Sequence, residues 1–160
     1  MSRTWKALGL ALALAAAGCT SATPARDVAA DKAKLEADAT SWFVFLDKGD
    51  IAGMANLYAD DARLTPPALP AITGRAAIKK YFDQDLGQMK TAGLAIKNGM
   101  TTGVDVSGDT GWISGNYTVV DATGATVDSG NYLSVHKLTN GQWLYIRDIW
   151  NSDRPPAPAK

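Results

Sequence analysis

The chain has 160 residues, and its 16 basic side chains balance 16 acidic ones. This balance excludes the strongly basic surface by which proteins bind nucleic acid without sequence preference. Hydrophobic residues make up 46% of the chain and charged residues 20%, which is typical of a globular protein. A chain of this length usually forms one domain.

The N-terminus has the pattern of a secretory signal peptide. Two basic residues precede an apolar segment, residues 7–17, that is too short to span a bilayer. The segment ends in AAGC, which resembles the lipobox of bacterial lipoproteins, although that motif prefers a branched residue where Ala16 stands. The resemblance implies cleavage before Cys19 and acylation of this cysteine. The alternative is a secreted protein with an unmodified cysteine.

Cys19 is the only cysteine, so no intramolecular disulfide can form. We predict a signal peptide at 1–18, a lipidated Cys19 and flexible tether at 19–26, a folded domain at 27–153 and a Pro-rich tail at 154–160. This organisation predicts an exported lipoprotein of the cell envelope, anchored in a membrane by its lipid and facing the periplasm or the cell exterior.

Helical patterns begin the folded domain. The first predicted helix has four apolar residues at helical spacing, which are Leu35, Ala39, Trp42 and Leu46. Gly49 is suited to end this helix, and Asp50 is suited to cap a second one over residues 51–58. A turn at 59–62 and a short strand at 63–65 are expected to follow.

The rest of the domain is predicted to contain one more helix and then strands. The helix is expected over residues 74–89, with Thr73 as its cap. Segments rich in β-forming residues follow at 94–106, 111–120, 126–138 and 142–151. Thr123-Gly124 and Asn140-Gly141 are typical of hairpin turns. Helices followed by an antiparallel meander predict an α+β fold.

These elements, in this order, resemble the nuclear-transport-factor-2-like superfamily, in particular its SnoaL-like bacterial branch. The resemblance rests on LDKGDIAGMANLYADDARLTPPALPAITGRAAIKKYF, SGDTGWISGNYTVVD, SGNYLSVHK and GQWLYIRDIWNSDRP. It implies a cone-shaped fold in which three N-terminal helices pack on the concave face of a strongly bent antiparallel sheet, around a pocket. Because the superfamily includes isomerases, dehydratases, cyclases, hydrolases and non-catalytic domains, the fold does not fix the function.

The ketosteroid isomerases of this superfamily use two aspartates and a tyrosine that this chain lacks. Alignment on the shared motifs places their catalytic base at Pro66, their oxyanion-binding tyrosine at Trp42 and their protonated aspartate near Ser134. Pro66 cannot accept a proton, and the indole of Trp42 is only a weak donor. Ketosteroid isomerisation by that mechanism is therefore excluded.

Alternation of side chains along the strands predicts which residues face the pocket. The resemblance places Trp150 inside, so alternation puts Leu144, Ile146 and Asp148 inside and Arg147 outside, unless a bulge reverses part of the pattern. The same comparison places His136 inside on the preceding strand. The predicted ligand pocket consists of Trp42, Tyr58, Tyr117, Tyr132, Ser134, Ile146 and Trp150.

Asp148 and His136 are the candidate catalytic residues. A carboxylate in an apolar pocket has a raised pKa and can act as an acid or base, and an imidazole can transfer protons near neutral pH. In the structural alternatives, Asp148 bonds to neighbouring groups and fixes the sheet to the first helix, and His136 is exposed or merely packed. No metal-binding, phosphate-binding or nucleophile motif occurs, and no cofactor is predicted.

The outer face of the sheet is predicted to be apolar. Its residues are Trp112, Leu133, Val135, Trp143, Tyr145 and Ile149. Such a face is unsuited to solvent, so we predict a homodimer with sheets packed face to face.

Three functions are compatible with these patterns. The leading one is binding of a small, largely apolar molecule in the pocket. The second is an enzyme of the isomerase or dehydratase type with Asp148 as general acid or base. The third is a non-catalytic dimeric assembly domain in which the pocket is a filled core.

Overall fold

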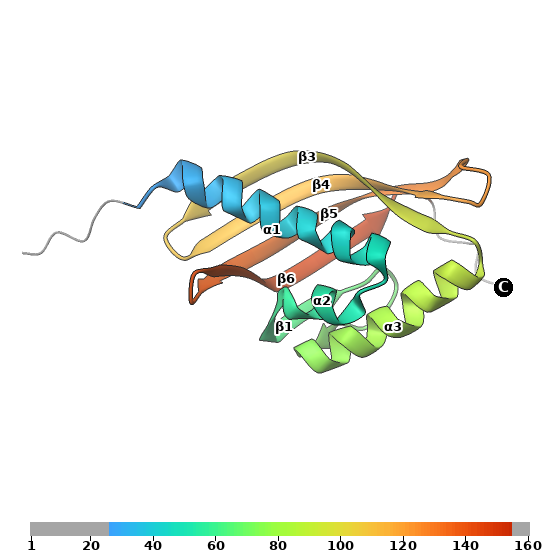
Figure 1. The fold of residues 1–160 in the computed structure, drawn as a ribbon, viewed down its shortest axis with the longest axis horizontal. Helices are drawn as coiled ribbons and strands as arrows, with labels where there is room; N and C mark the ends of the chain where they lie inside the picture. Colours follow the sequence, from blue (N-terminus) through green and yellow to red (C-terminus); the bar gives the residue numbers. More distant parts are fainter. Residues whose placement is uncertain (1–25, 155–160) are drawn as a thin grey trace, which may run out of the picture.

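The computed structural model describes residues 26–154, which form a mixed α+β domain (Figure 1). The predictions on the signal peptide, Cys19 and the tail beyond residue 154 concern parts of the chain outside this range. The helices are α1 (Val28–Lys48), α2 (Ile51–Asn56) and α3 (Arg75–Thr91). The strands are β1 (Tyr58–Thr65), β2 (Ile72–Thr73), β3 (Ala95–Ser107), β4 (Thr110–Val120), β5 (Thr126–Thr139) and β6 (Gln142–Ser152).

The strands form one curved sheet in the order β2-β1-β6-β5-β4-β3. All neighbours are antiparallel except β1 and β6, which are parallel. Helix α1 lies across the inner face of β3, β4 and β6, whereas α3 lies along β1 and β2 (Figure 1). The predicted fold class, with helices on the inner face of a bent sheet, is therefore confirmed.

Local signals explain the ends of the first two helices. Asp27 accepts hydrogen bonds from two backbone N–H groups in the first turn of α1. Gly49 ends α1 in the left-handed region at φ 68°, where a residue with a side chain would be strained. Asp50 then accepts from the N–H of Gly53 and caps α2. Both predicted boundaries are confirmed.

The second helix is shorter than predicted because its last residues join the sheet. Helix α2 ends at Asn56, and residues 58–65 form strand β1 instead of a turn and a short strand. The N–H of Tyr145 on β6 donates to the carbonyl of Leu57. Pairing with a central strand thus overrides the local turn signal of Asp60 and Asp61.

The start of α3 also differs from the prediction. Gly74 occupies the N-cap position, and no side chain caps the helix. Thr73 pairs with Arg63 as part of β2. The side chain of Thr73 therefore does not have the predicted capping role.

A bulge in β6 changes the predicted inner and outer faces. His136 pairs with Tyr145, but the adjacent Val135 pairs with Arg147, so Ile146 is an extra residue. Tyr145 and Asp148 therefore share the inner face although they are three positions apart. The prediction that placed Trp143 and Tyr145 outside is wrong, and so is the placement of Leu144 and Ile146 inside.

Two buried clusters hold the layers together. Trp143 packs with Leu35 of α1 and Val106 of β3 at one end of the sheet. Tyr58 of β1 stacks on Tyr145 of β6, with ring centroids 4.7 Å apart, and its ring centroid lies 5.7 Å from that of Phe82 on α3. Phe82 and Tyr145 of the second cluster also line a cavity.

Candidate functional site

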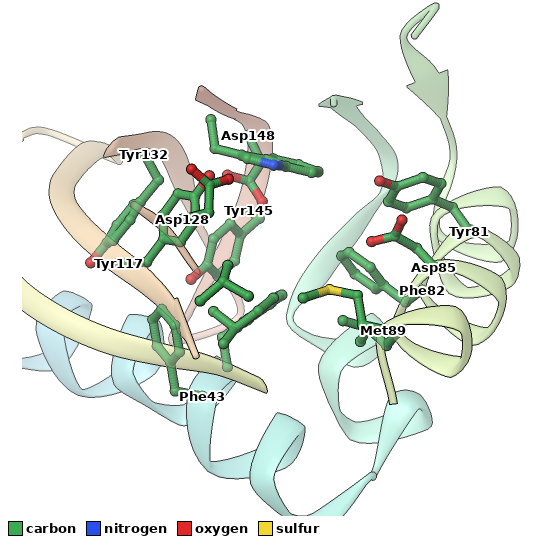
Figure 2. A pocket seen from close by; sticks show the side chains of 15 residues that line it. Phe43, Tyr81, Phe82, Asp85, Met89, Tyr117, Asp128, Tyr132, Tyr145 and Asp148 are labelled. Atoms are coloured by element: carbon green, nitrogen blue, oxygen red, sulfur yellow. The ribbon is translucent and has the colours of Figure 1, made fainter. Parts of the chain in front are cut away.

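A cavity of about 230 Å³ lies between α3 and the inner face of the sheet (Figure 2). From the helices it is lined by Trp42, Phe43, Tyr81, Phe82, Asp85, Leu86 and Met89. From the sheet it is lined by Ile96, Tyr117, Val119, Asp128, Tyr132, Tyr145, Asp148 and Trp150. Eight of these fifteen residues are aromatic, three are aspartates and none is basic, so the cavity is a mostly apolar site with a few acidic groups.

The structure brings together part of the predicted site. The predicted residues that line the cavity are Trp42, Tyr117, Tyr132, Asp148 and Trp150. Tyr58 and Ser134 are completely buried and do not line it. Ile146 does not line it either, because the bulge turns this side chain away from the inner face.

Asp148 is the half-buried carboxylate of the sheet wall. The Tyr58 hydroxyl donates a hydrogen bond to its Oδ2 at 2.5 Å. Burial raises the pKa of Asp148 to about 6, although the hydrogen bonds from Tyr58 and from the Ile149 N–H act in the opposite direction. The carboxyl group therefore changes charge near neutral pH, while it faces the cavity.

The partner of Asp148 is a poor proton donor for chemistry. Burial first, and the neighbouring Asp148 carboxylate second, raise the pKa of Tyr58 well above its ordinary value. The hydroxyl therefore stays protonated and acts as a hydrogen-bond donor. Asp148 therefore hydrogen-bonds a tyrosine, which agrees with the structural alternative, but the bond joins β6 to β1 and not the sheet to α1.

His136 is packed behind the cavity wall. It is fully buried, its ring lies 4.0 Å from that of Tyr145, and its Nε2 shares a 2.8 Å hydrogen bond with Ser134 Oγ. Burial lowers the pKa of His136 to about 3, so the imidazole is neutral at physiological pH. His136 does not line the cavity, and the two predicted catalytic residues do not face it together.

Two more carboxylates line the cavity. Asp128 on β5 accepts from Ser152 Oγ at 2.8 Å and from the N–H of Ser129 at 2.8 Å. Asp85 on α3 lies beside Tyr81, and burial raises its pKa. Figure 2 shows Asp85 on the helix wall, across the cavity from Asp128 and Asp148.

Glycines on neighbouring strands make room for two of the tyrosines. Gly115 pairs with Tyr132, and a Cβ on this glycine would lie 2.4 Å from the Tyr132 hydroxyl oxygen. Gly130 pairs with Tyr117, and a Cβ there would lie 2.5 Å from the Tyr117 hydroxyl oxygen. Each tyrosine ring therefore packs over the backbone of a glycine on the neighbouring strand. This packing fixes the orientation of the ring in the cavity wall.

The predicted site lacks four acidic or phenolic residues that line the cavity, which are Tyr81, Asp85, Asp128 and Tyr145. Asp128 has the same strand parity as Tyr132, four residues later. Asp85 lies between Phe82 and Met89 on α3, and these two apolar residues at helical spacing mark the face of the helix that lines the cavity. Uninterrupted alternation along the last strand predicts Tyr145 on the outer face, and the bulge at Ile146 reverses this placement.

Two features are absent from the described part of the chain. Residues 26–154 contain no group of three or more His, Cys, Asp or Glu side chains placed to hold a metal ion. None of the helices in that range has the length and apolar character needed to cross a membrane.

Comparison with known proteins identifies the domain. Residues 39–146 match the SnoaL-like domain family. The sequence matches no functionally curated protein. Among solved structures, an NTF2-like protein with a cystatin-like fold from Novosphingobium aromaticivorans is similar, with 22% identity, a TM-score of 0.68, and 75% of this chain and 80% of that one covered.

Two other solved structures carry functional descriptions. A ketosteroid isomerase-like protein from Erwinia carotovora atroseptica has 20% identity and a TM-score of 0.60, over 78% of this chain and 98% of that one. A candidate calcium/calmodulin dependent protein kinase II association domain from Xanthomonas campestris has 27% identity and a TM-score of 0.59, over 85% of this chain and 94% of that one. At these identities the likeness supports the fold rather than a shared activity.

Proposed function

Because the chain belongs to the SnoaL-like domain family, we propose that it binds a small, largely apolar molecule in the cavity between α3 and the sheet. The observation that carries the proposal is the cavity itself, whose walls are mostly aromatic. A filled core would not retain a space of about 230 Å³, so this observation favours binding over a purely structural assembly domain.

Catalysis by Asp148 is the second candidate function. Its specific support is a carboxylate that faces the cavity with a pKa of about 6, which suits a general acid or base near neutral pH. The support is weaker than that for binding. The side chain that hydrogen-bonds to Asp148 is Tyr58, whose raised pKa makes it a poor source of protons. His136, the other predicted proton carrier, lies behind Tyr145.

Native mass spectrometry of the full chain purified from its own envelope tests binding. We expect a small molecule to copurify, and we expect Met89→Trp to lose it because the larger ring fills the cavity. Gln88→Trp is the matched control, since it adds the same ring one residue away on an exposed position of α3. Absence of any adduct on the wild-type protein would contradict the proposal.

The same measurement separates binding from catalysis. Asp148→Asn keeps the shape of the side chain but removes its acid and base function. A ligand that is bound equally by wild type and by this variant, in unchanged chemical form, supports a binding protein. Conversion of the molecule by wild type and accumulation of the unconverted form on Asp148→Asn would support the enzyme.

We also propose that the protein is an exported lipoprotein. The basis is the signal-peptide pattern before Cys19 and the likeness of AAGC to a lipobox. Wild type should incorporate radiolabelled palmitate, and Cys19→Ser should not. Equal labelling of the two proteins would contradict the proposal.

A homodimer through the outer face of the sheet is the proposed assembly. Domains of this family often oligomerise. Trp112, Leu133 and Ile149 remain 40%, 44% and 48% exposed on the outer face, and Leu133 pairs directly with Ile149. Trp143 and Tyr145 no longer belong to this surface, which is therefore smaller than predicted.

Sedimentation velocity at micromolar concentration checks the assembly. We expect wild type to sediment as a dimer, and Leu133→Lys to shift it to the monomer because the new charge would be buried in the interface. Val44→Lys is the control, since Val44 is equally exposed but lies on α1. A monomeric wild type, or equal effects of the two substitutions, would argue against this interface.

A further inference from the structure

The charged residues that line the cavity are all acidic. Asp85, Asp128 and Asp148 line it, and no Lys, Arg or His does. Among residues 26–154, six ion pairs form, and every acidic member of these pairs lies elsewhere. The three cavity carboxylates thus have no cationic partner in the described domain.

The groups that do contact these carboxylates are neutral. Asp148 accepts from the Tyr58 hydroxyl, and Asp128 accepts from the Ser152 hydroxyl and a backbone N–H. Such bonds satisfy oxygen atoms but leave the negative charge in place. A partly desolvated carboxylate without a counter-charge raises the free energy of the folded protein. A bound cation would supply the counter-charge and offset this cost.

The aromatic rings favour the same kind of ligand. The ring faces of Trp and Tyr attract cations, most strongly where water is excluded. Trp150 of β6 and Tyr81 of α3 lie with ring centroids 6.4 Å apart, so aromatic side chains from the two walls meet beside Asp85 and Asp148. Apolar residues such as Met89 and Ile96 line the remainder and suit hydrocarbon substituents.

We infer that the ligand of the cavity is a small organic cation, such as a tertiary or quaternary ammonium compound with apolar substituents. The inference rests on the proposed binding function and specifies the class of ligand. The aromatic rings contact the alkyl and charged parts of the cation, while the three carboxylates supply the opposite charge from both walls.

Three probes of similar shape and different charge test this inference on the full-length protein. They are phenyltrimethylammonium, the neutral tert-butylbenzene and the anionic benzenesulfonate. Binding is followed by tryptophan fluorescence at pH 8, where Asp148 is ionised, because Trp42 and Trp150 line the cavity. We expect the cation to bind about tenfold tighter than the neutral probe, and the anion to show no binding.

Variants identify the source of the selectivity. Asp85→Asn should weaken binding of the cation about fivefold and leave binding of the neutral probe unchanged. Asp83→Asn is the matched control, because Asp83 lies two residues away on α3, pairs with Lys79 and does not line the cavity. An equal effect of the two variants would mean that net charge, rather than the cavity, selects the cation, which would overturn the inference.

The outcomes for ligand class and for binding are distinct. If the neutral probe binds as tightly as the cation or more tightly, the cationic ligand is excluded while the apolar binding site remains supported. Preferred binding of the anion would likewise overturn the inference. If no probe binds up to the solubility limit of the neutral one, both the ligand class and the proposed binding function fail.

Discussion

Asp148→Asn is expected to stabilise the protein at pH 8 by up to about 3 kcal/mol. The pKa of this carboxyl rises from an ordinary 3.8 to about 6 on folding, mainly through burial. This difference in proton affinity corresponds to about 3 kcal/mol of folding free energy that wild type loses once Asp148 is ionised. Asparagine removes the charge and retains an oxygen that can accept from Tyr58.

The gain should depend on pH in a defined way. Well below pH 4 the carboxyl is protonated in both folded and unfolded protein, so variant and wild type differ little. Between pH 4 and 6 the unfolded state ionises first, so wild type loses stability relative to the variant. Above pH 6 both states are ionised, and the difference is constant.

His136 acts in the opposite direction over an overlapping range. Its pKa falls to about 3 on folding, so it contributes stability above pH 6.5 that is lost as the pH falls towards 3. Wild-type stability alone would therefore mix the two effects. His136 is present in both proteins, so the difference between variant and wild type isolates Asp148.

Urea unfolding of both proteins from pH 4 to pH 8 measures this difference. Asp61→Asn is a suitable control, since Asp61 is an exposed residue of β1, and we expect it to change the unfolding free energy by less than about 0.5 kcal/mol. A variant that is less stable than wild type at pH 8 would show that the ionised Asp148 is a net structural anchor. A stabilised variant would show that the chain keeps a destabilising charge in its cavity, as functional sites do.

Gly130→Ala is expected to destabilise the protein by about 3 kcal/mol or more. Its Cβ would lie 1.9 Å from the Asn151 carbonyl oxygen, which is backbone of the neighbouring strand and cannot rotate away. The same Cβ would crowd the Tyr117 hydroxyl, which donates to that carbonyl. Overpacking against backbone is at the severe end of such effects.

Two other glycines give a ranking that denaturant unfolding can test. Gly115→Ala should destabilise less, because the three atoms nearest to its Cβ all belong to the side chain of Tyr132, which can move into the cavity. Gly87→Ala should stabilise by about 1 kcal/mol, because it lies within α3 with no atom near its Cβ. If Gly130→Ala unfolds no more easily than Gly115→Ala, the close approach of β5 and β6 is not as described.

The sequence determined the layout of the domain. Gly49 ends the first helix and Asp50 caps the second. The four predicted strand segments match β3 to β6 within one or two residues. These features depend on local conformational preferences and on the periodicity of apolar residues, and both are determined by residues that are close in sequence. The expected pairing of β4 with β5 also holds, since Ile113 pairs with Ser134 and Gly115 with Tyr132.

The tertiary structure decided which residues share the cavity. The two-residue turn at Asn140-Gly141 makes His136 and Tyr145 partners across the hairpin. Trp150 can lie on the same face as Tyr145 only if β6 has one extra residue between Tyr145 and Trp150. The turn register and the inward position of Trp150 are therefore compatible only if β6 contains a bulge. Neither of them shows that Ile146 is the extra residue. That choice depends on packing of the inner face against Leu35 and Phe82, which are distant in sequence.

The character of the site was likewise decided in three dimensions. The family resemblance predicts Trp150 in the pocket and strand alternation adds Asp148, but neither predicts that three carboxylates line the cavity without a basic residue. Asp128 reaches the cavity from β5, the neighbour of β6 in the curved sheet, whereas Asp85 faces Asp148 because α3 lies along β1. The sequence by itself thus determined the family and all the elements except β1 and β2. The curvature, the bulge and the position of α3 decided the site, because these depend on contacts between distant segments.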